Sequence, residues 1–261
     1  MLHFIKGFLS LRSFQVIIGN QKSRAFFEET GVPQGSVLAV TLFLIKMNSV
    51  FDSLPKGIRI FVYADDIVLM VVGKTVKALR RKLAQAASWV ASWASSTGFQ
   101  LSAAKSEYMH ICNSNHRILD NPIIIDGVAI PRRKTMKILG ITIDRHLTFT
   151  PHCDKIKEDC RSRINLIKAL SGRHTNSNRA TRLNVANMVI NSRLTYGLEL
   201  TITGVQTLVK KLGPTYRQTI RITAGLLPST PVNSVCVESG MLSFHHYIVS
   251  AICHRAISFF R

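Results

Sequence analysis

The stretch FVYADDIVLMV, Phe61 to Val71, constrains the fold most, because it places two adjacent aspartates between two short apolar runs. Apolar runs on both sides of a tight polar turn predict a β-hairpin with strands at Arg59–Tyr63 and Ile67–Val72. Neighbouring carboxylates raise each other's cost of ionisation unless a cation lies near them. Because aspartate also favours turns, an ordinary exposed hairpin turn is the alternative for this stretch alone.

Magnesium is the cation that such a pair suits. Mg²⁺ prefers hard oxygen ligands and is usually held by one or two carboxylates together with substrate phosphates. A strand–turn–strand with aspartates at its tip brings carboxylates to one edge of a sheet, as metal-assisted phosphoryl transfer requires. The stretch therefore predicts a Mg²⁺ site with Asp65 and Asp66 as ligands.

A second candidate site is the loop GVPQGS, Gly31 to Ser36. Its glycines allow the backbone to approach a ligand closely, and Pro33 stiffens the loop. A helix is expected to begin near Ser36, so that its first amide groups and its dipole favour a phosphate. Gln34 adds an amide that could bind a base or a sugar. Any Gly/Pro loop before a helix gives a similar pattern, so the loop alone is a weak signal.

The first part of the chain mixes strands and helices. A hairpin is expected around a Gly19-Asn20 turn, and Val37–Val50 reads as a helix so apolar that it should be buried. Thr75–Thr97 has one apolar stripe and a stop signal at Gly98, which predicts an amphipathic helix. Further strands are expected at Phe99–Ala103, at Glu107–Cys112 and within the stretches PIIIDGVAI and KILGITID.

The second part is helical. The first helix should begin with Thr150 as N-cap and Pro151 in its first turn, and the last should break near Gly240. The expected fold class is α+β, with one mixed domain at 1–149 and a basic all-α domain at 150–261. The expected helices are His152–Leu170, Arg179–Leu198, Gln206–Leu226 and Val232–Phe260.

The charge balance points to a polyanionic partner. The chain has 34 Lys and Arg against 14 Asp and Glu, a net charge of +20. Residues 1–130 carry 14 basic and 8 acidic groups, whereas residues 131–261 carry 20 and 6. Such an excess favours nucleic acid or an acidic membrane surface, with the second half of the chain as the stronger binder.

Cysteine usage and hydropathy narrow the class further. The five cysteines form no CxxC pair, so a zinc knuckle and a disulfide framework are both disfavoured and an intracellular protein, nuclear or cytoplasmic, is expected. No apolar run has the length of a membrane span, and no membrane partner is expected. The basic residues of Met1–Phe27, without any acidic one, also resemble a mitochondrial transit peptide, which is the alternative to the hairpin there.

The motifs taken in order are more specific than any one of them. GVPQGSVLAVTLFLI, FVYADDIVLMV, GFQLSAAKSEYMHI and KTMKILGITID resemble the palm of a reverse transcriptase in order and spacing. The nearest match is the LINE-type reverse transcriptases of jockey-like, non-LTR retrotransposons. The stretch IRITAGLLPSTPVNSVCVESGMLSF also resembles the segment that follows the polymerase in those elements, so the resemblance covers nearly the whole chain.

The resemblance implies roles for the palm residues. It implies an RNA-directed DNA polymerase that uses Mg²⁺, an RNA template, a DNA primer and dNTP, with 1–149 as a partial palm of antiparallel sheet and packed helices. Asp65 becomes the principal metal ligand and Asp66 an accessory one. Lys105 matches the lysine near the departing pyrophosphate; an ordinary solvated lysine is the alternative. Template and nucleotide contacts fall on Gln34, Gly35 and Tyr63, and the primer grip falls on Leu139 and Gly140.

The helical region 150–261 would then be the thumb and connector. Its first helix carries basic residues that could follow a duplex backbone without reading its sequence. An ordinary exposed helix face is the alternative for each of them. The residues are Lys155, Lys157, Arg161, Arg163 and Lys168.

The chain departs from the family in one respect. Reverse transcriptases carry a further catalytic aspartate on a strand upstream of the GVPQG loop, yet here no carboxylate precedes Glu28 and the first aspartate is Asp52. We therefore expect weak polymerase activity, or none, from these 261 residues alone, and expect an upstream part of the same polyprotein as a required partner. The alternatives are a non-catalytic nucleic-acid-binding remnant of a retroelement and a mitochondrial maturase-like protein.

Overall fold

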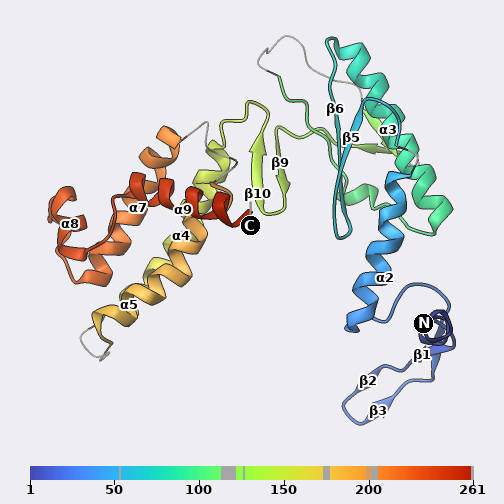
Figure 1. Cartoon of the computed structure of the whole chain (residues 1–261), viewed down its shortest axis with the longest axis horizontal. Coiled ribbons are helices and arrows are strands. Elements are labelled where there is room, and N and C mark those ends of the chain that lie inside the picture. The colour runs from blue at the N-terminus through green and yellow to red at the C-terminus, as the bar shows by residue number, and fades with distance from the viewer. Residues whose placement is uncertain are drawn as a thin grey trace. The chain divides into compact units, whose positions relative to one another are not determined.

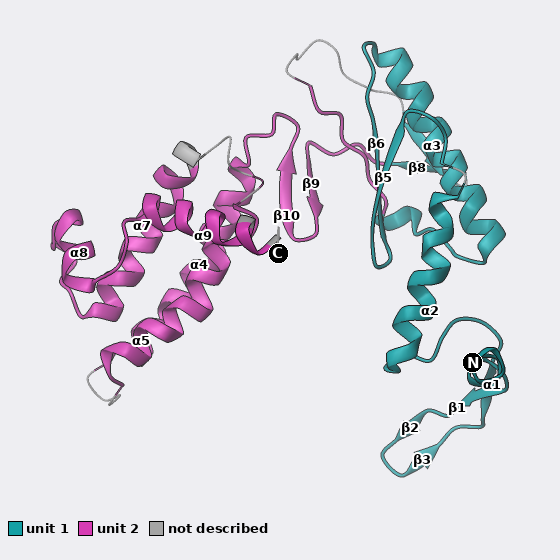
Figure 2. Ribbon diagram, viewed as in Figure 1, with its two compact units in different colours: residues 1–105, 121–130 teal, residues 106–120, 131–261 magenta. Residues whose placement is uncertain are grey.

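The computed structural model describes residues 1–52, 54–112, 122–125, 127–172, 177–198, 200 and 205–259. The chain divides into two compact units, one made of residues 1–105 with 121–130 and the other of residues 106–120 with 131–261 (Figure 2). The described strands form two-stranded antiparallel sheets among helices, so the α+β class is confirmed. None of the described helices combines the length and apolar character needed to cross a bilayer.

Among its described residues, the first unit contains three helices, short 3-10 turns and four two-stranded antiparallel sheets; Figure 1 labels α2, α3 and hairpin β5–β6 among them. Pairing is β1 with β4, β2 with β3, β5 with β6, and β7 with β8. Its elements are α1 (Leu2–Leu9), β1 (Arg12–Phe14), β2 (Ile17–Ile18), β3 (Gln21–Lys22), β4 (Phe26–Glu28), α2 (Val37–Asn48), η1 (Ser49–Phe51), β5 (Ile58–Tyr63), β6 (Asp66–Val71), α3 (Val76–Thr97), η2 (Ala103–Lys105), β7 (Ile123–Ile125) and β8 (Val128–Ile130).

The expected local signals hold in most of this unit. The N-terminal hairpin turns at Gly19-Asn20 as predicted. Thr75 caps α3 by accepting a hydrogen bond from the N–H of Ala78 at 3.2 Å, and Gly98 ends α3 in the left-handed conformation, φ +80°. The helix packs its apolar stripe on one face of hairpin β5–β6, and the Trp93 indole N–H donates to the Ser49 hydroxyl at 3.0 Å. This small core supports the tip of that hairpin.

The burial expected for the helix after the GVPQGS loop is wrong. Helix α2 forms where predicted, yet only Ala39 and Met47 within it are buried. Val37 is 91% and Val40 64% exposed. The apolar composition predicted burial of the helix, whereas among the described residues α2 joins the core around Trp93 through Phe43 and Met47.

The second unit is a hairpin followed by helices. Strands β9 and β10 pair antiparallel across a Leu139-Gly140 turn, as predicted. Its elements are β9 (Thr135–Ile138), β10 (Ile141–Asp144), α4 (Thr150–Leu170), α5 (Arg179–Ala186), the π-helical segment η3 (Asn187–Asn191), α6 (Ser192–Leu194), α7 (Val205–Ala224), α8 (Val232–Ser239) and α9 (Phe244–Phe259).

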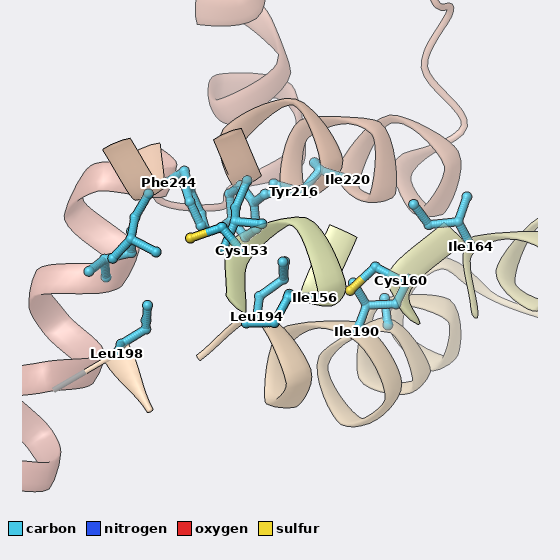
Figure 3. Close-up of a cluster of buried hydrophobic side chains, with 14 of the residues drawn as sticks. Cys153, Ile156, Cys160, Ile164, Ile190, Leu194, Leu198, Tyr216, Ile220 and Phe244 are labelled. Carbon is cyan, nitrogen blue, oxygen red and sulfur yellow. The ribbon is translucent and has the colours of Figure 1, made fainter. Parts of the chain in front are cut away.

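The helices of this unit enclose one apolar core, shown in Figure 3. Residues of α4 at i, i+3, i+4 and i+7 spacing, including Ile156, Cys160 and Ile164, face Leu194 and Tyr216. Gly240 separates α8 from α9, so the break expected there is confirmed. The helix expected at Arg179–Leu198 is interrupted by η3, where Arg163 donates to the carbonyl of Val189 at 2.7 Å.

The first turn of α4 is stabilised differently from the prediction. Pro151 lies in the first turn as expected, but Thr150 is already helical and no side chain bonds at the N-cap, Phe149. Instead the carboxylate of Asp144 accepts from the N–H of Phe149 at 2.7 Å and of His146 at 3.1 Å. Burial acts to raise the pKa of Asp144, but these hydrogen bonds, with those from Thr148, outweigh it and lower the pKa.

Two further expectations need correction. Phe99–Ala103 and Glu107–Cys112 are not strands; the second contributes only an isolated bridge from Tyr108 to Arg132. Both runs have a β-rich composition, but in the part of the chain that the structure describes no strand pairs with either of them. Asp126, half of an expected turn, lies outside the described residues. The functional boundary expected at residue 149 stays a prediction, while the compact units place β9–β10 with the helices that follow.

Candidate active site

Asp65 and Asp66 lie at the tip of hairpin β5–β6. Tyr63 and Asp66 are the last paired residues, and Ala64 and Asp65 form the turn between them. All four are exposed, and neither carboxylate has a hydrogen bond or an ion pair with a described residue. The first strand ends at Tyr63 as predicted, whereas the second begins one residue earlier than predicted, so Asp66 belongs to β6 rather than to the turn.

The turn is built under strain. Ala64 has φ +52°, a left-handed conformation that costs an L-residue about 1–2 kcal/mol. The hairpin can hold this conformation because Val62 and Ile67, adjacent to the tip, pack on the α3 side of the sheet. Strained turns of this kind concentrate at functional sites.

The donor set at the tip fits a single Mg²⁺. No group of three or more His, Cys, Asp or Glu in the described part of the chain is placed to share one metal ion. Two adjacent carboxylates without protein counter-ions can still hold a Mg²⁺ when nucleotide phosphates complete its shell. A two-metal site needs further carboxylates that these residues do not provide.

The GVPQGS loop has the geometry of a loop open to a ligand. Gly31 and Gly35 have φ of +82° and +88°, and no atom lies within 4 Å of a Cβ built on either glycine. Helix α2 follows directly, and its N-cap residue, Ser36, makes no side-chain cap hydrogen bond. Gln34 is exposed between the two glycines. The expected loop before a helix N-terminus is therefore confirmed in geometry, while its ligand stays a prediction.

Arg12 holds this loop in place through hydrogen bonds, a role that the sequence analysis did not predict. Its guanidinium donates to the carbonyl oxygens of Thr30 at 2.8 Å and Gly31 at 3.0 Å. It also donates to the carbonyl of Leu9 at 3.3 Å and pairs with Glu28 at 3.3 Å. Since these partners are as many as 19 residues away, no local pattern indicates the role.

Lys105 lies in the 3-10 turn η2, and Leu139 and Gly140 form a hairpin turn, while the roles expected for these residues stay predictions. Lys105 is the exposed last residue of η2, at the end of the first unit. Leu139 and Gly140 form the β9–β10 turn, with φ of +47° and +84°. Tyr196 contacts both residues, through its hydroxyl on the Leu139 carbonyl and its ring 3.3 Å from a Cβ built on Gly140. No sequence pattern indicated this role of Tyr196.

The basic residues expected on α4 divide into exposed and engaged ones. Lys155, Lys157 and Arg161 are exposed, and Arg163 is half-buried and bonded to Val189. The same helix carries three acidic residues, of which Asp154 and Asp159 form ion pairs with Lys211 and Arg193. The guanidinium of Arg163 therefore also has a structural role, and nucleic-acid contacts on α4 stay predictions.

Comparison with known proteins identifies the class. Residues 2–143 match the family model described as reverse transcriptase (RNA-dependent DNA polymerase), and the chain belongs to that family. The match includes the GVPQGS loop, the Asp65-Asp66 tip, Lys105 and the Leu139-Gly140 turn. The two-stranded sheets and helices described above are consistent with part of such a domain.

Curated relatives identify the branch. The RNA-directed DNA polymerase from mobile element jockey of Drosophila melanogaster is 25% identical over 227 residues, covering 85% of this chain and 25% of the relative. The jockey polymerase of Drosophila funebris is 26% identical over 211 residues, covering 77% and 22%. The probable RNA-directed DNA polymerase from transposon BS of Drosophila melanogaster is 28% identical over 175 residues, covering 65% and 19%. The expected relation to non-LTR retrotransposon polymerases is confirmed, and the chain spans about a quarter of the length of the jockey relatives.

Proposed function

We propose that this chain is the palm and thumb part of an RNA-directed DNA polymerase of a non-LTR retrotransposon. The observation that carries the proposal is the pair of exposed, uncompensated carboxylates at the tip of a packed hairpin within a reverse transcriptase domain. The substrates are an RNA template, a DNA primer and dNTP. The net charge of +20 supports a polyanionic partner.

The residues of the first unit that we propose to bind substrate and metal are all exposed to solvent. Asp65 and Asp66 hold Mg²⁺, which when bound neutralises charge on the nucleotide phosphates. Lys105 stabilises the charge of the departing pyrophosphate. Gln34, at the open GVPQGS loop, and Tyr63, beside the tip, contact template and nucleotide through exposed side chains, and Gly35 does so through its backbone.

The second unit supplies the proposed primer contacts. The Leu139-Gly140 turn steadies the growing 3′ end of the primer, and the exposed residues of α4 support the duplex backbone. The residues of α4 in this role are Lys155, Lys157, Arg161 and Arg163.

We expect these 261 residues alone to extend a primer weakly or not at all. They offer one carboxylate pair at the tip, whereas two-metal chemistry needs ligands from a further strand. The region that matches this chain is only part of a longer protein in the relatives, so the preceding part of the same polyprotein is the proposed source of the missing ligand.

Mg²⁺-dependent dNTP binding tests the metal role without requiring polymerisation. Calorimetric titration of the chain with dNTP and Mg²⁺ should show binding that Asp65→Asn weakens at least about tenfold, since one of two carboxylate ligands is lost. Asp52→Asn makes the same charge change at an exposed position outside the hairpin and should leave binding unchanged. Equal binding by wild type and Asp65→Asn would reject the assignment.

A non-catalytic nucleic-acid-binding role is the second candidate. It is favoured by the lack of a third carboxylate near the tip among the described residues and by the basic excess of residues 131–261. Duplex binding that is unchanged by Asp65→Asn, falls steeply with salt and occurs without any Mg²⁺-dependent dNTP binding would favour this role.

A further inference from the structure

A buried imidazole joins hairpin β9–β10 to the helix that follows it. His152 lies in the first turn of α4 and is only 1% exposed. Its Nδ1 accepts a hydrogen bond from the backbone N–H of Thr142 on β10 at 3.3 Å. Because a two-stranded sheet leaves some N–H groups of each strand without a strand partner, this imidazole satisfies a backbone group of β10 that would otherwise lack one.

The chain after α6 closes over the same place. Gly197 has φ +73°, and a Cβ built on it would lie 2.7 Å from the Ile141 side chain and 3.8 Å from Nε2 of His152. The preceding residue, Tyr196, contacts the Leu139 carbonyl through its hydroxyl. The hairpin, the first turn of α4 and residues 195–198 therefore meet around the ring, all within the second unit.

The hydrogen bond from Thr142 determines where the neutral ring carries its proton. A ring nitrogen that accepts a hydrogen bond has no proton, so neutral His152 is the tautomer protonated on Nε2. Nε2 is itself buried and has no hydrogen-bond partner among the described residues. A positively charged imidazole carries N–H on both nitrogens and cannot accept, so protonation would remove the bond to Thr142 and leave two donors facing each other.

The surroundings of the ring favour its neutral form. Burial, the largest effect, lowers the pKa of His152 below the ordinary 6.5, and the charge of Arg193 acts in the same direction. The backbone of Tyr196 and the charge of Asp159 act to raise the pKa but do not outweigh burial. Asp159 is moreover paired with Arg193 at 2.7 Å, so the two charges largely offset each other at the ring.

Other charged or titratable groups on the elements around the ring are engaged elsewhere or exposed. They are Asp144 of β10, which accepts from the N–H of Phe149; Asp154 of α4, paired with Lys211 of α7; Arg255 of α9, which donates to the Thr195 carbonyl; and the exposed His146 and Lys155.

We propose that His152 is a positioning residue whose neutral imidazole holds hairpin β9–β10 against the first turn of α4, and whose protonation releases the hairpin while the helices stay packed. The inference goes beyond the proposed function, since it concerns the order of the hairpin and not the chemistry at Asp65. It adds a pH dependence to that function, because a released Leu139-Gly140 turn is no longer placed to steady a primer.

The direction of the pH effect follows from the two states of the hairpin. Release exposes His152 to water, where its pKa returns to about 6.5, so the released state binds the proton more readily than the closed state. The hairpin is therefore held fully above pH 6.5 and loosens as the pH falls below that value toward the lowered pKa of the closed state.

Amide hydrogen exchange of the intact chain tests the proposal without any substrate. Protection factors, which are corrected for the intrinsic effect of pH on exchange, would be measured from about pH 7.5 to about pH 5.5. Protection across residues 135–144 should fall about tenfold relative to α4 and α7, because pH 5.5 lies one unit below the ordinary pKa. Hairpin β5–β6 of the first unit should keep its protection and serves as the internal reference.

Two variants with the same substitution assign the effect to one histidine. His152→Asn places an amide oxygen, an acceptor that does not titrate, close to the position of Nδ1, so protection of the hairpin should become independent of pH. His110→Asn is the matched control, because burial also lowers the pKa of the half-buried His110 in the same unit. This variant should show the same fall in protection as wild type.

Nitrogen NMR of the imidazole adds a measurement on the wild-type chain, which matters if His152→Asn does not fold. At about pH 7.5 the ring of His152 should carry its proton on Nε2 and none on Nδ1. The opposite tautomer would overturn the inference.

The exchange experiment can overturn it in three further ways. Constant protection of the hairpin in wild type would show that no release occurs. An unchanged fall in His152→Asn, or a fall abolished by His110→Asn, would assign the titration to another group. A simultaneous loss across α4 and α7 would mean that the whole unit opens. Each of these results leaves the proposed function standing, because Mg²⁺-dependent dNTP binding is measured separately.

Discussion

The hydroxyl of Tyr196 donates a hydrogen bond to the carbonyl oxygen of Leu139 at 2.5 Å. This contact connects the turn of hairpin β9–β10 to the chain just after α6. The guanidinium of Arg193 lies 5.9 Å from the centre of the Tyr196 ring and pairs with Asp159 of α4 at 2.7 Å. The turn proposed to steady the primer is therefore positioned by the helices of its own unit.

Removing the Tyr196 hydroxyl should weaken this connection. Tyr196→Phe is expected to lower the free energy of unfolding by about 0.5–1 kcal/mol, because one hydrogen bond to a partly exposed carbonyl is lost. Urea denaturation measures the change. Tyr63→Phe is the control, since the Tyr63 hydroxyl has no partner among the described residues. Equal stability of Tyr196→Phe and wild type would show that the contact contributes nothing.

Because Gly140 is crowded by Tyr196, replacing it with alanine should destabilise the protein more than the same replacement at Gly127. Gly140 and Gly127 have φ of +84° and +77°, but only Gly140 has the Tyr196 ring 3.3 Å from a built Cβ. Gly127→Ala should cost about 1–2 kcal/mol for the left-handed backbone, and Gly140→Ala should cost more. Thermal unfolding of both variants decides the point, and a smaller loss at Gly140 would contradict the described packing.

The hydrogen bonds that Asp144 accepts at the start of α4 should make the free energy of unfolding depend on pH. Because its pKa is lowered below the ordinary 3.8 in the folded protein, the unfolded chain binds the proton more readily. The stabilisation is therefore complete above pH 3.8 and is lost as the pH falls through the lowered pKa. Unfolding free energies from pH 7 to pH 2.5 should show a gap between wild type and Asp144→Asn that closes in acid.

Asp154→Asn is the control for this acid dependence, because Asp154 is exposed on α4 and pairs with Lys211 at the surface. Its gap from wild type should be small at every pH. A gap for Asp144→Asn that widens in acid would refute the cap.

Arg12 should control the order of the GVPQGS loop. Arg12→Ala removes every hydrogen bond from one guanidinium, so amide hydrogen exchange across residues 26–36 should accelerate at least about tenfold. Arg12→Lys should restore little, because an ammonium cannot span the same carbonyls. Glu28→Gln removes only the exposed ion pair and should change exchange far less. Slow exchange in Arg12→Ala would mean that the loop is ordered by other contacts.

The sequence analysis predicted helices and hairpins correctly where a few neighbouring residues determine the local structure. Hairpin β5–β6 follows from apolar runs around a polar turn, and Thr75 and Gly98 end α3 as their conformational preferences require. The hairpin at Leu139-Gly140 was likewise predicted from its own residues, although Tyr196 also contacts its turn. These are also the elements that carry most of the candidate site.

Features that depend on distant partners were not predictable in the same way. The exposure of α2 depends on what packs against it, and the strand expected at Phe99–Ala103 has no partner strand among the residues that the structure describes. Arg12 and Tyr196 bond to carbonyl oxygens 18 and 57 residues away. A side chain that bonds to a backbone group far away in the sequence produces no periodic pattern from which the bond could be predicted.

The central claim is that Asp65 serves an RNA-templated polymerase. The direct measurement is Mg²⁺-dependent primer extension by a jockey protein in which the aligned region is replaced by residues 1–261. We predict extension on an RNA template that Asp65→Asn abolishes and Asp52→Asn preserves. Extension that survives Asp65→Asn would contradict the claim, and a folded chimaera without any extension would favour the non-catalytic binding role.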